Sequence, residues 1–345
     1  EHQQLWPIYS DDHPLESGLD GQARLHSTLN ILDGSTAPAV SWESSIFPAR
    51  IPDYEPEWLD AMCISGKIVW GRYLLPLTQN PQKLKGLQSQ RKRSAGPVKS
   101  TPVSLLARIN QDIWKVLAEV QTADNQALWL SDSANRIESD LLEFGASFLD
   151  QIQGRTDLCK SQLERGLAEL VSLGRVCSDS FTGLRALLTP HQHRSSVSSK
   201  GSRTAMFGVE DAGRWSLLQT FSGANEQHYP RSEVGLNEEQ MERLAIIYLQ
   251  RWGVVFRALI EKESLSPPWR KLLAVYRRME LKGAIRGGRF ISGVGGEQFA
   301  FAETIDGLRK LKRAREASAS APYYCLSATD PANLINLILP TRKLA

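Results

Sequence analysis

Cations recur on one face of a helix that the sequence predicts in the last third of the chain. They occupy helical spacing opposite an apolar stripe, and the small Ala274 lies among them. Cations that neutralise phosphates release bound counterions, so such a face is expected to bind nucleic acid with an affinity that falls as salt rises. The cations of this face are Arg270, Lys271, Arg277 and Arg278.

Two further cations, Arg286 and Arg289, flank Gly287 and Gly288 in the segment that follows this helix. Glycine carries no side chain, so the backbone there is open to a ligand. We therefore predict that all six cations contact nucleic acid. A solvated basic face, or a face that docks on another protein module, is the alternative interpretation of the same residues.

No signature of catalysis accompanies these cations. The sequence lacks the G-x-x-x-x-G-K-[ST] loop of ATP-binding proteins, and it lacks G-x-S-x-G and H-E-x-x-H. The four cysteines form no C-x-x-C pair, so we expect no zinc site, no disulfide framework and no cofactor in this chain. Asp330, in Ala-Thr-Asp-Pro, is the one acid in a suggestive place, although Asp-Pro is also an ordinary turn signal.

The composition is that of a folded protein. The chain has 345 residues, of which 41% are hydrophobic and 23% charged, and this length predicts two or three domains. The net charge of +3 says little about partners. No apolar run approaches the roughly 18 residues of a membrane span, and the first residues are unlike a signal peptide. We expect a cytoplasmic protein, and an initial Glu indicates a piece of a longer one.

An internal repeat organises the chain around Gly66, Gly174 and Gly283, which lie 108 and 109 residues apart. Each glycine follows apolar residues spaced as on a buried helix face, and a β-branched residue comes two positions later. Glycine commonly ends a helix because it adopts the left-handed conformation cheaply. Helix, glycine and strand together form the junction between the third helix and the wing of a winged helix-turn-helix.

The third copy predicts this fold in most detail. Asn237 and Gln240 predict a capping box for a helix that runs to Trp252 and is broken by Gly253. A short helix over 256–263 follows. The third helix is predicted to begin at Ser266-Pro267, and the hairpin strands are predicted at 284–292 and 297–301.

The predicted fold class is mainly α with small β wings. It consists of tandem winged-helix modules followed by the first strands of a truncated β-barrel. In the second module we expect a helix over 103–120 and wing residues at 184–188. The predicted boundaries are module 1 at 1–78, a basic linker at 79–100, module 2 at 101–190, a Ser-rich linker at 191–212, module 3 at 213–315 and the barrel start at 322–345.

Several segments resemble, in the same order, stretches in the C-terminal region of Lhr-type (large helicase-related) proteins. The resemblance is carried by the combination, since each piece alone is short. The matching segments are 42–54 (beginning Trp-Glu-Ser-Ser-Ile-Phe-Pro), 58–70, 213–218 (Gly-Arg-Trp-Ser-Leu-Leu), 289–300 (Arg-Phe-Ile-Ser-Gly-Val-Gly-Gly-Glu-Gln-Phe-Ala) and 326–333 (Leu-Ser-Ala-Thr-Asp-Pro-Ala-Asn).

This resemblance implies a bacterial ATP-dependent helicase that moves 3′ to 5′ on single-stranded DNA and acts in DNA repair. ATP and Mg would bind in a motor that is absent from this chain. The family's C-terminal region is similar to AlkZ-type DNA glycosylases, and uracil-DNA glycosylase activity has been attributed to it. The resemblance also implies that the region forms oligomers, namely tetramers. The partners implied are DNA, the motor domains of the same polypeptide and further copies of the chain. A glycosylase acid near the family's C-terminus would lie beyond Ala345.

Three functions are compatible with these features. The first is the DNA-binding and assembly region of a repair helicase, and the second is part of a uracil-DNA glycosylase, which needs an acid poised over a flipped base. The third is a winged-helix transcription regulator. Three modules of unequal basicity disfavour the regulator, and the sequence shows no poised acid for the glycosylase. We therefore prefer the helicase region.

Overall fold

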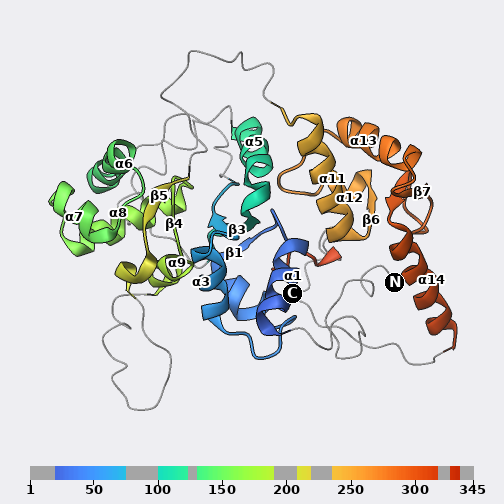
Figure 1. Ribbon diagram of the computed structural model, residues 1–345, viewed down its shortest axis with the longest axis horizontal. Coiled ribbons are helices and arrows are strands. Elements are labelled where there is room, and N and C mark those ends of the chain that lie inside the picture. Colours follow the sequence, from blue (N-terminus) through green and yellow to red (C-terminus); the bar gives the residue numbers. More distant parts are fainter. Residues whose placement is uncertain are drawn as a thin grey trace, which may run out of the picture. The chain divides into compact units, whose positions relative to one another are not determined.

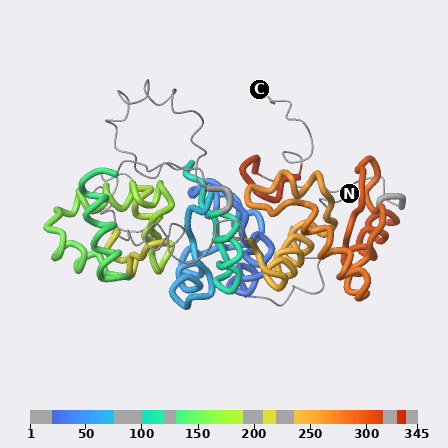
Figure 2. Tube along the Cα trace, turned by 90° about the horizontal axis from the view of Figure 1, so that it is seen from above, coloured from blue at the N-terminus to red at the C-terminus, as the bar shows by residue number. Residues whose placement is uncertain are grey.

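The computed structural model describes residues 20–74, 100–122, 130–189, 208–218, 235–317 and 327–334, which are coloured in Figures 1 and 2. These residues are mainly helical with short antiparallel strands, which confirms the predicted class. The chain divides into two compact units. Unit 1 consists of 1–35, 41–54 and 235–345, and unit 2 consists of 36–40 and 55–234.

Unit 1 holds the third copy of the repeat together with the first helices of the first copy. The Asn237–Gln240 capping box is confirmed, and the helix ends at Trp252 before Gly253, whose φ is +66°. Its elements are α1 (Gly21–Ile31), η2 (Trp42–Ile46), α11 (Glu238–Trp252), β6 (Val254–Phe256), α12 (Arg257–Ile260), α13 (Trp269–Leu281), β7 (Arg286–Gly288), β8 (Gln298–Ala300) and α14 (Ala302–Ala317).

Two predictions for this unit are wrong in detail. The segment predicted as a helix over 256–263 follows a buried strand, β6, and only α12 within it is helical. The third helix begins at Trp269 rather than at Ser266, and no side chain caps it. Two consecutive prolines explain the delay, because a residue that precedes proline is pushed out of the helical region.

The core of unit 1 forms around α13. Leu272, Tyr276 and Met279 are buried on its inner face. The ring of Tyr276 stacks on Phe299 of β8 with 5.2 Å between centroids, and its hydroxyl donates to the carbonyl of Ala245 in α11 at 3.2 Å. The helix is therefore held between α11 and the sheet, with its opposite side left to solvent.

Unit 2 contains the remainder of the first copy and the whole second copy. Three helices of the second copy, α6, α7 and α8, pack together, and they are the green segments of Figure 2. The elements of the unit are β1 (Thr36–Pro38), α3 (Pro56–Ile64), β2 (Ile68–Gly71), β3 (Pro102–Ala107), η3 (Arg108–Asn110), α5 (Gln111–Thr122), α6 (Asp132–Phe144), α7 (Leu149–Thr156), α8 (Lys160–Ser172), β4 (Val176–Ser178), α9 (Thr182–Leu188), η4 (Val209–Ala212) and β5 (Trp215–Leu217). A short helix, α2 (Ala39–Ser41), follows β1.

The segment predicted as a helix over 103–120 begins instead with β3, and it becomes helical only from residue 108. Strand β3 lies between β1 and β2 in one antiparallel sheet. Its side chains are buried from Val103 to Ala107, because both faces of the strand are covered. The predicted linker 79–100 therefore connects two strands of one sheet, and the predicted boundary between modules 1 and 2 divides that sheet.

The second predicted linker, 191–212, has the same relation to the second sheet. Strand β5, which the sequence analysis placed in module 3, pairs with β4, and Trp215 also bridges to Ser147. The sheet order Ser147–β5–β4 thus repeats β1–β3–β2 and β6–β8–β7. The predicted wing residues 184–188 are helical and belong to α9.

The three repeat glycines adopt the predicted conformation. Gly66, Gly174 and Gly283 have φ values of +73°, +69° and +76°. After each glycine the next amide donates to a carbonyl five residues earlier, at 3.1, 2.9 and 3.0 Å. This bond closes a helix C-terminus around a left-handed residue. The repeat of helix, glycine and strand is confirmed at all three positions.

Gly283 permits a clean test of this geometry. A Cβ added there meets no atom within 4 Å, so Gly283→Ala should cost only the left-handed backbone penalty, about 1–2 kcal/mol of unfolding free energy. The control is Gly154→Ala inside helix α7, where a Cβ also meets nothing within 4 Å and helix propensity should make the change neutral or stabilising. If calorimetry finds the two variants equally stable, the left-handed conformation assigned to Gly283 is contradicted.

The predicted barrel start, 322–345, lies mostly outside the described residues. Its described part, 327–334, forms turns, and Asp330 within it is buried. Both carboxylate oxygens of Asp330 accept from Arg50, at 2.5 and 2.9 Å, and Oδ1 also accepts from the amide of Ala332. The hydroxyl of Thr329 donates to that of Ser41 at 3.1 Å. This segment is thereby anchored to residues 41–50 within unit 1.

Candidate nucleic-acid interface

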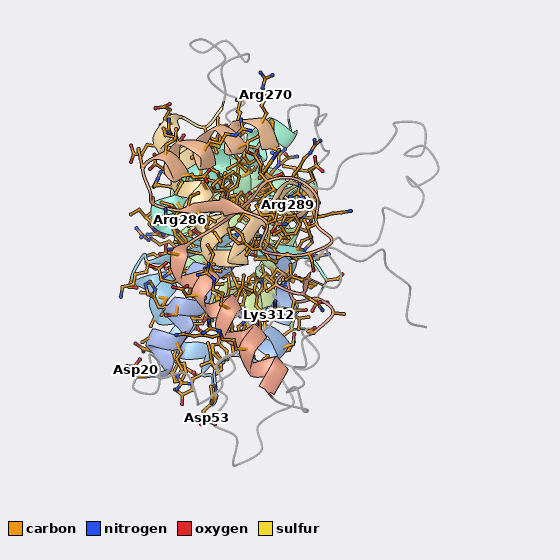
Figure 3. All side chains as sticks on the ribbon, turned by 90° about the vertical axis from the view of Figure 1, so that its right-hand side faces the viewer. Asp20, Asp53, Arg270, Arg286, Arg289 and Lys312 are labelled. Carbon is orange, nitrogen blue, oxygen red and sulfur yellow. The ribbon has the colours of Figure 1, made fainter. Side chains whose placement is uncertain are left out.

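The solvent-facing side of α13 carries the predicted cations. Arg270, Lys271 and Arg277 are exposed, Arg278 is half-buried, and Ala274 is exposed between them. The wing adds the exposed Arg286 and Arg289. Figure 3 shows Arg270, Arg286 and Arg289 on the same side of the molecule. The structure thus brings the predicted residues of helix and wing together on unit 1.

Ion pairs divide these cations into two groups. Arg277 pairs with Glu297 at 3.0 Å, and Arg278 pairs with Glu238 at 2.7 Å and with Glu242 at 3.6 Å. A phosphate would have to compete with these carboxylates. For the other four cations, no carboxylate in the described ranges lies within 4.0 Å; they are Arg270, Lys271, Arg286 and Arg289.

The backbone at the wing is less open than predicted. The amide of Gly287 donates to Glu280 Oε1 at 3.1 Å, and a Cβ at Gly287 would meet that oxygen at 2.5 Å. A carboxylate from the end of α13 therefore occupies the position where a phosphate oxygen was expected. A larger residue at position 287 would require the Glu280 carboxylate to move away from the wing backbone.

A buried side chain, Gln298, holds the wing in shape. Its Oε1 accepts from the amides of Phe290 and Ile291, both at 2.8 Å. Its Nε2 donates to the carbonyls of Ile291 and Val294, at 3.0 and 3.3 Å. The side-chain amide thus spans the loop between β7 and β8 and fixes the backbone next to Arg289.

Replacing Gln298 should loosen this loop. Gln298→Ala leaves the amides of Phe290 and Ile291 without their acceptor and should cost about 1–3 kcal/mol. Gln298→Glu keeps that acceptor but turns a buried carboxylate oxygen towards the carbonyls of Ile291 and Val294, so it should be no less destabilising. Hydrogen exchange at the two amides measures the change. Unaltered protection in Gln298→Ala would show that the loop is held by other contacts.

The third helix of the first copy, α3, is engaged within unit 2. Asp60 pairs with Arg185 at 3.0 Å and accepts from the amide of Thr182 at 2.9 Å, and both partners lie on α9. The adjoining strand adds a bond from Trp70 Nε1 to the carbonyl of Ser180 at 2.9 Å. Helix α3 therefore packs against the second module rather than presenting a basic face.

The third helix of the second copy, α8, carries mixed charges. Lys160 pairs with Glu210, and Glu164 is buried at 4% exposure. Arg165 donates to the carbonyl of Ser161 in its own helix. Among the three equivalent helices, α13 has the most basic exposed face.

Helix α14 carries a run of cations that was not among the residues predicted from the sequence. Arg309, Lys310, Lys312 and Arg313 are all exposed. A signal was available, because Leu-Arg-Lys-Leu-Lys-Arg is a short basic run of the kind that marks nucleic-acid surfaces. Helix α14 follows β8 directly in the same unit as α13 and the wing.

The cysteines that the structure describes show no sign of a metal or redox centre. Burial raises the pKa of the Cys63 and Cys177 thiols, whereas the hydrogen bond with Ser161 lowers the pKa of the exposed Cys159. Within the described ranges, no three residues among His, Cys, Asp and Glu are grouped to hold a metal ion. No helix in that part of the chain is both long and apolar enough to cross a membrane.

Two segments of the chain match family models described as "Large helicase-related protein, winged-helix domain". The matched residues are 3–84 and 235–320. The chain is an Lhr-type winged-helix region. The second match covers α11 to α14, so the basic face of α13 and the wing lie within an Lhr winged-helix domain.

Two relatives align with nearly the whole Lhr-type region. One, from Escherichia coli (strain K12), is named Lhr helicase/uracil glycosylase and is 31% identical over 341 residues, which are 94% of this chain and 20% of the relative. The other, from Mycolicibacterium smegmatis, is named Lhr helicase/probable uracil glycosylase and is 27% identical over 341 residues, which are 92% of this chain and 19% of the relative. The chain therefore spans about a fifth of the length of these relatives.

Proposed function

We propose that this chain is the DNA-binding region of an Lhr-type ATP-dependent 3′–5′ helicase that acts in DNA repair, and that α13 and its wing contact the phosphate backbone. The observation that carries the proposal is the set of four cations on this face without a nearby carboxylate from the described residues. Winged helices place their third helix at the major groove, and α13 is that helix here.

The proposal has a direct test. A fluorescently labelled duplex and a labelled single strand of the same sequence are titrated with the chain at several salt concentrations, and anisotropy measures binding. The logarithm of the affinity should fall linearly with the logarithm of the salt concentration, since phosphate neutralisation releases counterions. Absence of binding to both probes at low salt would overturn the proposal.

The proposal also covers the motor domains, the cellular location and the oligomeric state. ATP and Mg would be bound by motor domains in the same polypeptide, and this chain would need no cofactor of its own. It would act in the cytoplasm as part of a homo-oligomer, with the tetramer as the expected form. Equilibrium sedimentation of the chain tests the oligomer separately from DNA binding.

Uracil-DNA glycosylase is the second candidate, and the names of both relatives favour it. Such an enzyme needs an acid that can reach a flipped base. Asp330, the acid singled out from the sequence, is unsuited because Arg50 and the backbone engage both of its oxygens. Incubation of the chain with a uracil-containing single strand, followed by cleavage at abasic sites, measures this activity.

A further inference from the structure

We propose that α14 is a second phosphate-binding element, which continues the α13–wing face so that unit 1 holds a longer stretch of DNA than one winged helix does. This inference rests on the proposed function. It adds residues that the sequence analysis did not consider, and it predicts how affinity depends on the length of the DNA.

The position of α14 is set by the sheet. Arg286 in β7 pairs across the ladder with Ala300, and α14 begins only two residues after Ala300. The helix therefore starts beside the wing. Sixteen residues at about 1.5 Å each give a helix about 24 Å long, so its later turns lie well beyond the wing.

Charge is distributed unevenly along α14. The acids Glu303 and Asp306 lie in its first two turns and Glu316 lies near its end, while the four exposed cations lie between them, at 309–313. Asp306 pairs with Arg309 at 2.9 Å. For the other three exposed cations, no carboxylate of the residues that the structure describes lies within 4.0 Å; these three, here called the α14 triad, are Lys310, Lys312 and Arg313.

Figure 3 relates Lys312, one residue of the triad, to the predicted face. From top to bottom in this view come Arg270, the wing pair Arg286 and Arg289, and then Lys312 on α14. Asp20 and Asp53 appear below them. In this view the four labelled cations run from the start of α13, past the wing, to α14.

A phosphate backbone fits this arrangement by charge. Duplex DNA carries one negative charge for about every 1.7 Å of its axis, so a strip of spaced cations can be matched along its length. The simpler explanation is that cations in the last turns of a helix stabilise its own dipole. That explanation predicts an effect on helix stability and none on DNA binding, so the two can be separated.

The test compares the triple variant Lys310→Gln, Lys312→Gln, Arg313→Gln with wild type on duplexes of about 10 and 20 base pairs. The control is Arg309→Gln on the same helix, whose cation is already paired. For the longer duplex we expect the triple variant to bind roughly 10-fold more weakly and its salt slope to fall by about 2–3, since each neutralised phosphate contributes about 0.9. The shorter duplex and the control should change by less than about twofold.

The results for the two sets of variants separate the role of α14 from that of α13 and the wing. Unchanged affinity and slope for the triple variant, while Arg270→Gln with Arg289→Gln weakens binding, overturns the role of α14 and leaves the proposed function standing. If neither variant weakens binding, the role of α14 and the phosphate contact proposed for α13 and the wing are both overturned; the proposed DNA-binding function is overturned only if wild type binds neither probe. Circular dichroism reports whether α14 stays folded. If the triple variant has less helix than wild type, the single variants Lys310→Gln and Lys312→Gln are tested in its place. A loss of affinity for the longer duplex of twofold or more in each supports the proposal, and no loss of affinity overturns it.

Discussion

Glutamine at Arg270 and Arg289 together is expected to lower the affinity of the chain for duplex DNA by roughly 10-fold or more near physiological salt. Both side chains are exposed, and no carboxylate of the described residues lies within 4.0 Å of either. The salt slope should also fall by about 0.9 for every phosphate that the variant no longer neutralises. Anisotropy titrations at several salt concentrations measure both quantities.

The matched control is the double variant Arg277→Gln with Arg278→Gln, which removes the same charge from the same face. Glu297 and Glu238 already neutralise these two arginines, so the loss of affinity should be clearly smaller. Equal losses from the two double variants would mean that the ion pairs open when DNA binds. No loss from Arg270 and Arg289 would remove this face from the interface.

Asp330→Asn is expected to be the most destabilising single change, at about 3–5 kcal/mol of unfolding free energy for unit 1. Asp330 forms an ion pair with Arg50, and both side chains are buried, with exposures of 5% for Arg50 and 1% for Asp330. Removing one partner leaves a buried charge without compensation, and this desolvation cost is the reason for the large effect. Calorimetry of the purified variant measures the shift in melting temperature.

An exposed ion pair supplies the control for Asp330. Arg309 and Asp306 pair at 2.9 Å with exposures of 68% and 64%, so Asp306→Asn should cost no more than about 1 kcal/mol. Replacing both buried partners, Arg50→Met with Asp330→Leu, should recover much of the stability because no charge is left behind. If Asp330→Asn lowers the free energy of unfolding no more than Asp306→Asn does, the Arg50–Asp330 pair does not anchor the segment 327–334.

Local signals in the sequence predicted the parts of the fold that depend on neighbouring residues. Asn237 and Gln240 lie three residues apart and cap α11 as expected. Gly283 ends α13 because the chain must turn left-handed within one residue. Such features are readable because all of their atoms belong to one short segment.

Pairings between distant segments were not predictable in this way. Strand β3 belongs between β1 and β2, although more than sixty residues separate Thr36 from its partner Ser104. The acids that neutralise Arg277 and Arg278 come from the wing and from α11, at separations of 20 and 40 residues. Helical spacing located the basic face, but only the three-dimensional arrangement decides which of its cations are available to a ligand.

In two of the three sheets, a long segment of the chain joins a pair of neighbouring strands, and such segments can differ in length between related proteins. Residues 72–101 join β2 to β3, and 179–214 join β4 to β5, whereas the third hairpin is closed by only 289–297. Doubling the length of such a connection costs only about 0.6 kcal/mol of closure entropy. Insertions can therefore accumulate at these wings without disturbing the sheets. A protease that cut the chain inside one of them would yield two fragments still joined by strand pairing.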